Sequence, residues 1–64
     1  MRTFVDKVFK DADGTELHYM EVIGDSTEVP KLPTEHIVDG SNFLASDSAE
    51  VWFFNERSGA WIEA

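Results

Sequence analysis

The run Val51-Trp52-Phe53-Phe54 restricts the fold of this chain more than any other feature. Successive side chains of a β-strand point to opposite faces, so Val51 and Phe53 point one way and Trp52 and Phe54 the other. An antiparallel strand with one face in water alternates polar and apolar residues instead. Both faces of this strand therefore require burial, in a chain of only 64 residues.

Two β-strands joined by a tight turn are predicted at the N-terminus. Residues 2–9 and 16–23 are rich in β-branched and aromatic side chains, which favours strands over helices. Between them, Asp13-Gly14 is a strong hairpin signal, because glycine tolerates a positive φ and aspartate bonds to the local backbone. We therefore expect residues 2–23 to form a β-hairpin.

Residues 24–40 are expected to cross between two β-regions. Pro30 and Pro33 each lack a backbone N–H and push the preceding residue toward extended geometry, so we predict an extended segment there. Thr34 is a candidate N-cap for a short helical turn that ends near Gly40.

The C-terminal block, residues 41–64, predicts a three-stranded antiparallel meander. Its strands are expected at residues 42–46, 50–55 and 60–63, with turns at residues 47–49 and 56–59. The late glycine of the second turn is typical of hairpins with a loop of this length. The chain is therefore predicted to be a single all-β, mainly antiparallel domain over residues 1–64, in which the hairpin and the meander form a small single sheet or a partial barrel.

One face of the strand around Trp52 can pack on the N-terminal hairpin, and two arrangements can bury the other. In the first, the sheet is strongly curved and residues 29–38 cover that face with Leu32 and Ile37. In the second, another copy of the chain or a partner covers it, because large exposed apolar patches usually mark interaction sites, and Trp and Phe are enriched in interface cores. The candidate interface residues are Phe43, Trp52, Phe54 and Trp61.

The size of the chain favours a protein partner. Small natural domains usually gain stability from disulfides, a metal or oligomerisation, and this chain has no cysteine. Self-association remains among these supports, so a homo-oligomer is expected. The absence of cysteine also fits a cytosolic protein.

The charge of the chain excludes several partners. Thirteen Asp and Glu residues oppose five Lys and Arg, giving a net charge of −8, which repels nucleic acid and anionic membranes. The acids are spread from Asp6 to Glu63, as on a solvated surface. The alternative is mimicry of a phosphate backbone by an inhibitor. No apolar run exceeds four residues, whereas a membrane helix needs ~20, so no membrane span is expected.

No constellation of residues points to catalysis, a metal or a cofactor. The acidic turn that begins at Asp11 lacks the glutamate that a calcium loop needs at its twelfth position, where Val22 stands. His18 and His36 are the only histidines, and without cysteine they do not make up a zinc ligand set. No serine lies in a Gly-x-Ser-x-Gly elbow. We therefore expect no enzyme activity, no metal and no cofactor.

The C-terminal half carries an ordered series of residues. The series runs from Gly40-Ser41 through an apolar strand, Asp47 and the stretch Val51-Trp52-Phe53-Phe54-Asn55-Glu56 to Trp61, with Pro33-Thr34-Glu35 upstream. It resembles a pattern of small, mostly uncharacterised bacteriophage and prophage proteins: Gly-Ser, a short apolar strand, Asp-Thr-Gly, Val-Tyr-Phe-Phe-Asp-Glu and Trp. The resemblance covers residues 30–62, about half of the chain.

Two positions depart from that pattern. Ser48-Ala49 stands where the pattern has Thr-Gly, so the turn type can differ, and Trp52 stands in place of Tyr. The pattern describes strand packing and carries no chemistry. The resemblance implies a small virion-associated or accessory protein, in the virion or the bacterial host cytoplasm, that acts through self-association or by docking on a larger virion component. The alternative is an acidic host-takeover protein that binds a basic host protein.

Overall fold

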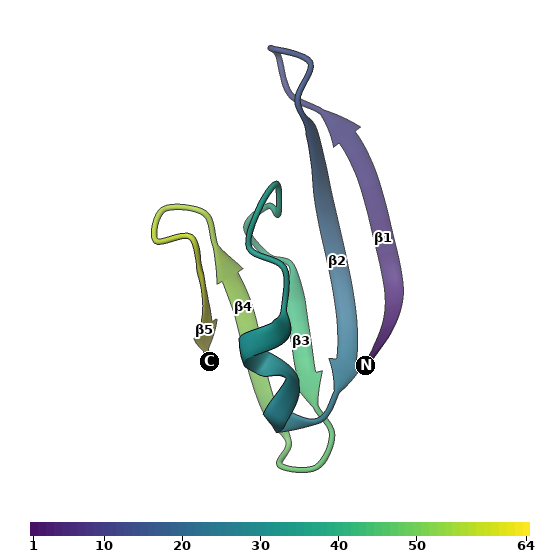
Figure 1. Cartoon of the computed structure of the whole chain (residues 1–64), viewed down its shortest axis with the longest axis vertical. Coiled ribbons are helices and arrows are strands. Elements are labelled where there is room, and N and C mark those ends of the chain that lie inside the picture. The colour runs from purple at the N-terminus through teal and green to yellow at the C-terminus, as the bar shows by residue number, and fades with distance from the viewer.

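A computed structural model describes all of residues 1–64. Five strands form one open sheet in the order β1-β2-β3-β4-β5 (Figure 1). The strands are β1 (Arg2–Lys10), β2 (Glu16–Gly24), β3 (Asn42–Ala45), β4 (Glu50–Asn55) and β5 (Ala60–Glu63), and a 3₁₀-helix, η1, spans Ser26–Lys31. The prediction of an all-β chain built from a hairpin and a meander is confirmed, and the sheet is open rather than closed into a barrel.

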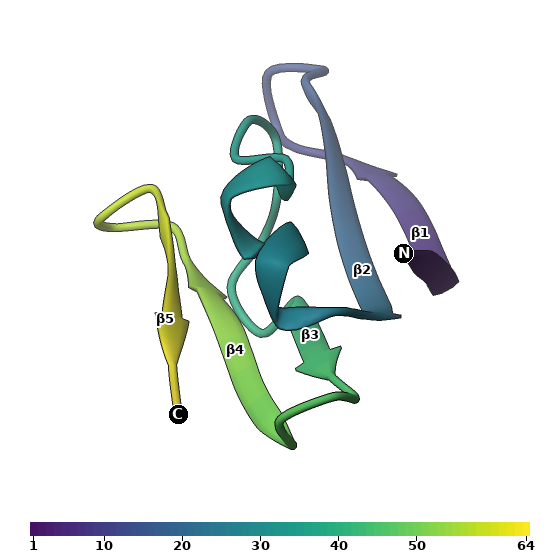
Figure 2. The same ribbon diagram turned by 60° about the horizontal axis from the view of Figure 1, so that its bottom comes forward.

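The hairpin and the meander lie side by side in the same sheet. Every neighbouring pair of strands is antiparallel except β2 and β3, which run parallel from Glu21 opposite Asn42 to Gly24 opposite Ala45. Residues 25–41 connect these two strands and cross over one face of the sheet (Figure 2). The hairpin therefore extends the sheet at the edge of β3. It does not pack on a face of β4, which is the position that the sequence analysis allows for it.

The hairpin of β1 and β2 turns as its sequence predicts. Gly14 has a φ of 88°, which glycine tolerates best, and the Asp11 N–H donates to the Thr15 carbonyl at 2.9 Å. Farther down, the register shifts between Thr3 and Val5, which is a β-bulge in the outermost strand. The turn of the hairpin reaches well beyond β3 and β4 (Figure 1).

The crossing segment begins with a helix and not with the extended backbone that the prolines predicted. Asp25 is the N-cap of η1, and its side chain accepts a hydrogen bond from the Thr27 N–H at 3.2 Å. The Glu28 carboxylate accepts from the Asp25 N–H at 2.8 Å, which completes a capping box. Pro30 lies inside this helix. The prediction of an extended segment there was therefore wrong.

The second half of the crossing segment also differs from the prediction. No helical turn follows Thr34. Instead, the chain pairs briefly with β2: the His18 N–H donates to the His36 carbonyl at 2.7 Å, and the Val38 N–H donates to the His18 carbonyl at 3.0 Å. These hydrogen bonds belong to a parallel bridge between His18 and Ile37. They pair backbone N–H and C=O groups that a helical turn would have paired within itself.

A small core lies between the sheet and the crossing segment. Its central cluster contains Val22, Leu32, Phe43 and Ala45, with Met20, Val29, Trp52 and Trp61 packed against it. Leu32 and Ile37 are buried, so residues from the segment 29–38 do cover the face that carries Trp52. This covering is the one expected in the first of the two arrangements. The structure contains no helix with the length and apolarity needed to cross a membrane.

The turn between β3 and β4 coincides with one departure from the phage pattern. Ala49 has a φ of 60°, in the left-handed region that glycine favours. The backbone therefore adopts, with alanine, a conformation that suits the glycine of the pattern.

Candidate protein-interaction surface

The four predicted interface residues, Phe43, Trp52, Phe54 and Trp61, lie on the face that the crossing segment covers. Phe43 is 0% and Phe54 4% exposed, and both indoles are only partly exposed. Phe43 belongs to the chain's own core cluster and Phe54 is buried, while Trp52 and Trp61 pack against that cluster, as in the first of the two arrangements. The physical reason is that the crossing segment packs on the side of β4 to which Trp52 and Phe54 point.

Contacts of Trp61 show how this side is held. Its indole N–H donates to the Pro33 carbonyl at 2.9 Å, and its ring meets that of Phe54 edge to face with 5.4 Å between centroids. The indole of Trp52, by contrast, has a buried Nε1 without a hydrogen-bond partner. Both tryptophans therefore pack against the core, but only the indole N–H of Trp61 has a hydrogen-bond partner.

The opposite side of the sheet carries several of the large apolar residues that remain in water, while Val8 is exposed on the covered side. Directly paired residues of neighbouring strands point to the same face, and the register gives the rows Ile23–Leu44–Val51 and Asn42–Phe53–Ile62 on this side. Leu44 is 39%, Phe53 44% and Ile62 49% exposed. Both views place η1 and the rest of the crossing segment on the other side (Figures 1 and 2).

We call this side the uncovered face. It comprises the side chains that alternate with the core positions on all five strands: Arg2, Val5, Lys7, Phe9, Leu17, Tyr19, Glu21, Ile23, Asn42, Leu44, Val51, Phe53, Asn55, Ala60 and Ile62. Tyr19 and Glu21 separate its apolar part over β2 to β5 from Phe9 and Leu17 of the hairpin. Such a patch, exposed on an open sheet, is typical of a binding surface or of self-association.

A short polar network lies in the middle of the uncovered face. The Tyr19 hydroxyl donates to the Glu21 carboxylate at 2.8 Å, and the Asn42 amide approaches the same hydroxyl at 3.5 Å. The hydrogen bond with Glu21 raises the pKa of Tyr19 above its ordinary value, because it stabilises the protonated hydroxyl. The network fixes these side chains on β2 and β3 and gives the Glu21 carboxylate a hydrogen-bond donor.

The charges of the strands are divided between the two faces. Four of the five strand carboxylates point to the covered side, as their cross-strand partners do: Asp6, Glu16, Glu50 and Glu63. The uncovered face carries Glu21 together with Arg2 and Lys7. The other eight acids lie in the turns and the crossing segment. A chain of net charge −8 thus presents one face whose formal charge is +1, from two bases and one acid.

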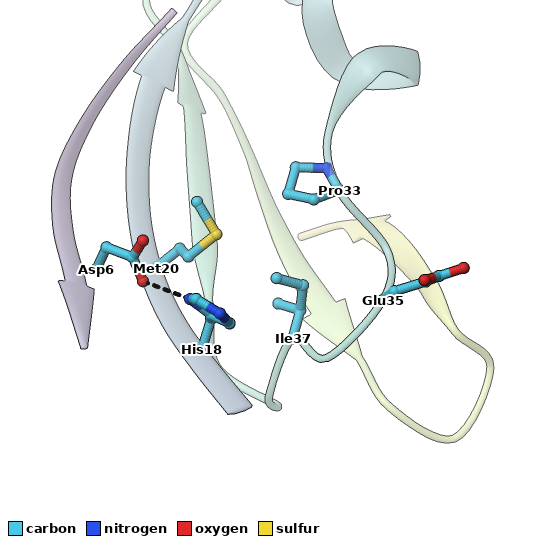
Figure 3. A pocket seen from close by; sticks show the side chains of 6 residues that line it. All are labelled: Asp6, His18, Met20, Pro33, Glu35 and Ile37. Carbon is cyan, nitrogen blue, oxygen red and sulfur yellow. Dashed lines mark hydrogen bonds and ion pairs between the residues drawn. The ribbon is translucent and has the colours of Figure 1, made fainter. Parts of the chain in front are cut away.

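A shallow pocket lies on the covered side, beside the hairpin (Figure 3). It has a volume of about 240 Å³ and is lined by Asp6, His18, Met20, Pro33, Glu35 and Ile37. His18 Nδ1 lies 2.9 Å from Asp6 Oδ1, whereas the carboxylate of Glu35 points away from this pair (Figure 3). The lining contains no hydroxyl or thiol, and no three His, Cys, Asp or Glu side chains of the chain are grouped to hold a metal ion.

No protein-family model, no curated protein and no solved structure matches this chain. The resemblance to bacteriophage and prophage proteins therefore stays a prediction.

The sequence contained the signal for the uncovered face. Leu44 alternates with the buried Phe43 and Ala45, and Ile62 follows Trp61, so both share a face with Phe53 once the register is known. We expected the hairpin to be able to cover one face of β4. Its position at the edge of the sheet leaves that face open.

Proposed function

We propose that this chain is a non-enzymatic protein that acts through protein–protein contacts made by its uncovered face. The observation that carries the proposal is the exposure of Leu44, Phe53 and Ile62 in adjacent rows of one open sheet. Apolar side chains of this size gain about 1.5–3 kcal/mol each when they pass from water into a packed interface. A partner that covers both rows therefore gains binding energy without any chemistry at the surface.

The proposed biological setting is that of a small virion-associated or accessory protein of a bacteriophage or prophage. Its support is the residue series from Gly40 to Trp61. The virion or the bacterial host cytoplasm is the corresponding location. A larger virion component or another copy of the chain is the corresponding partner.

Two matched substitutions test the proposal. Ile62 and Val8 are both β-branched residues on edge strands, and they are 49% and 51% exposed. Ile62 lies on the uncovered face, while Val8 pairs with His18 and points to the other side. Ile62→Lys therefore places a charge in the proposed contact, and Val8→Lys places the same charge outside it.

The tagged wild-type chain and both variants serve as bait in a lysate of the cells that make the chain. We expect the proteins retained by the wild-type chain, including untagged copies of itself, to be retained by Val8→Lys and lost with Ile62→Lys. Equal retention by Ile62→Lys and the wild-type chain would overturn the proposal.

A second candidate function, inhibition of a basic host protein, is favoured by a separate observation. The N-terminal amine lies 3.1 Å from Glu28, and His18 Nδ1 lies 2.9 Å from Asp6. No Lys or Arg side chain lies within 4.0 Å of a carboxylate of the chain. Binding by these acids would weaken with salt. Capture of a basic protein that is lost at high salt and unchanged by Ile62→Lys would support this function over the first.

A further inference from the structure

We propose that the partner of the uncovered face is the same face of a second copy, so that two sheets pack into a β-sandwich dimer. This inference rests on the proposed function, since it names the occupant of the same surface. Three features carry it: the area of the face, its charge, and the state of the sheet edge.

The dimensions of the chain fit a standard dimer interface. The molecule measures 39 × 23 × 16 Å along its principal axes, and the sheet lies across the two longer axes (Figure 1). An ellipse of those two lengths covers roughly 700 Å², close to the ~800 Å² that each partner contributes to a standard interface. One face of this single sheet is therefore large enough for a stable dimer.

The distribution of charge favours a second copy as the occupant. Two chains of charge −8 repel each other unless their acids face away from the contact. The uncovered face meets this requirement, because Asp6, Glu16, Glu50 and Glu63 point to the other side. The uncovered face also carries both signs, Glu21 with Arg2 and Lys7. In an isologous contact each copy offers the same surface, so a face with both signs can pair its charges with those of the second copy.

The edge of the sheet is protected, which favours packing through the face. β1 is the long edge strand, and a second β1 could in principle pair with it. The bulge between Thr3 and Val5 interrupts its ladder, and Lys7 and Lys10 stand on it. Bulges and lysines are the devices by which natural sheets prevent edge pairing. No such device protects Leu44, Phe53 or Ile62 on the face.

The sandwich would also supply the burial that the single chain lacks. Only seven of 64 residues are buried, and a chain of this size is marginal as an isolated domain. Two sheets packed about 10 Å apart interdigitate the side chains of their inner faces. Phe53 and Leu44 would then lie in a second core, on the opposite side of the sheet from Phe43 and Phe54.

Sedimentation equilibrium of the untagged full-length chain tests the proposal. We expect the wild-type chain and Val8→Lys to have twice the monomer mass of 7.2 kDa. Ile62→Lys should raise the dissociation constant by at least ~100-fold, because the dimer would hold the unpaired charge twice, and each 1.4 kcal/mol is a factor of ten. Phe53→Lys is a second variant on the same face, and circular dichroism verifies that each variant is folded.

The outcomes separate this inference from the proposed function. A wild-type monomer at millimolar concentration would overturn the dimer, while loss of a captured heterologous protein with Ile62→Lys would still uphold the uncovered face as the contact surface. A dimer that survives Ile62→Lys and Phe53→Lys but dissociates in Val8→Lys would overturn the face-to-face arrangement. A dimer lost in both face variants and kept in Val8→Lys supports it.

Discussion

Trp52 and Trp61 occupy similar places on the covered side, yet their polar atoms are treated differently. The indole N–H of Trp61 donates to the Pro33 carbonyl at 2.9 Å, which fastens β5 to the crossing segment just after η1. The N–H of Trp52 is buried without a partner, and such an unpaired donor costs about 1–3 kcal/mol. Trp52 therefore contributes apolar contacts but leaves a buried N–H unpaired. Trp61 contributes apolar contacts and a hydrogen bond.

This difference predicts unequal effects of the same substitution. Both Trp52→Phe and Trp61→Phe lose apolar area, but Trp52→Phe also removes the unpaired donor, and Trp61→Phe also removes a hydrogen bond. We expect Trp61→Phe to lower the free energy of unfolding by about 1–2 kcal/mol more than Trp52→Phe does. Urea denaturation of the two variants measures the difference. An equal or larger loss for Trp52→Phe would show that its N–H is satisfied in solution.

At the scale of elements, the start of η1 and the turn between β3 and β4 are joined by one carboxylate. Asp47 accepts hydrogen bonds from the Ser26 N–H at 2.8 Å and from the Ser26 hydroxyl at 2.7 Å. These bonds from Ser26 lower the pKa of Asp47 below its ordinary value of 3.8. The carboxylate form is thus the one that holds the crossing segment to the sheet.

The lowered pKa predicts a defined dependence of stability on pH. A carboxyl whose pKa is lower in the folded state stabilises the fold above the unfolded-state pKa, and this contribution is lost as the pH falls from about 3.8 through the lowered value. We expect Asp47→Asn to lower the melting temperature at pH 7 and to lose part of the decrease that the wild-type chain shows below pH 4. Glu35→Gln, an exposed carboxylate without a hydrogen bond, is the control and should follow the wild-type curve.

The strands could be predicted from local signals, while the path between them could not. The parity of Val51, Trp52, Phe53 and Phe54 and the glycine of the Asp13-Gly14 turn are properties of adjacent residues, and both reappear in the structure. The helix η1 depends on Asp25 and Glu28 as a capping box, a local signal that competes with the preference of Pro30 for an extended predecessor.

The parallel pairing of β2 with β3 was beyond local signals altogether. It joins residues that are 21 positions apart, as in the pair of Glu21 with Asn42. No turn residue encodes such a pairing, because it depends on contacts between segments that are far apart in the sequence. The face that residues 25–41 cross is likewise not set by local signals, and it decides which face remains open. The candidate residues Phe43, Trp52, Phe54 and Trp61 lie on the face that this segment covers.

At the scale of the whole molecule, the sheet separates two surfaces of different character. One side carries the crossing segment, the small core and four of the five strand acids, and the other carries exposed apolar rows with little charge. In the proposed dimer, the second side would make an additional apolar contact. We therefore expect the stability of the chain to depend on protein concentration.

The dependence of the melting temperature on protein concentration therefore tests for the proposed dimer. Only the folded chain dimerises, so mass action raises the melting temperature as the protein concentration rises. For a dimer of this size the rise is roughly 5 °C for each tenfold increase in protein concentration. We expect this rise for the wild-type chain and for Val8→Lys, and a constant melting temperature for Ile62→Lys. Calorimetry over a hundredfold range of concentration measures it. A wild-type melting temperature independent of concentration would contradict the dimer.

The bulge at Thr3 to Val5 has a consequence for this assembly's upper size. A regular nine-residue edge strand with Phe4, Val8 and Phe9 exposed could pair with the edge strand of another molecule. Repetition of this pairing would build a cross-β fibril. Bulges in edge strands are one of the devices by which natural sheets limit such pairing. We therefore expect a variant without the extra residue to associate through the edge of β1 more readily than the wild-type chain.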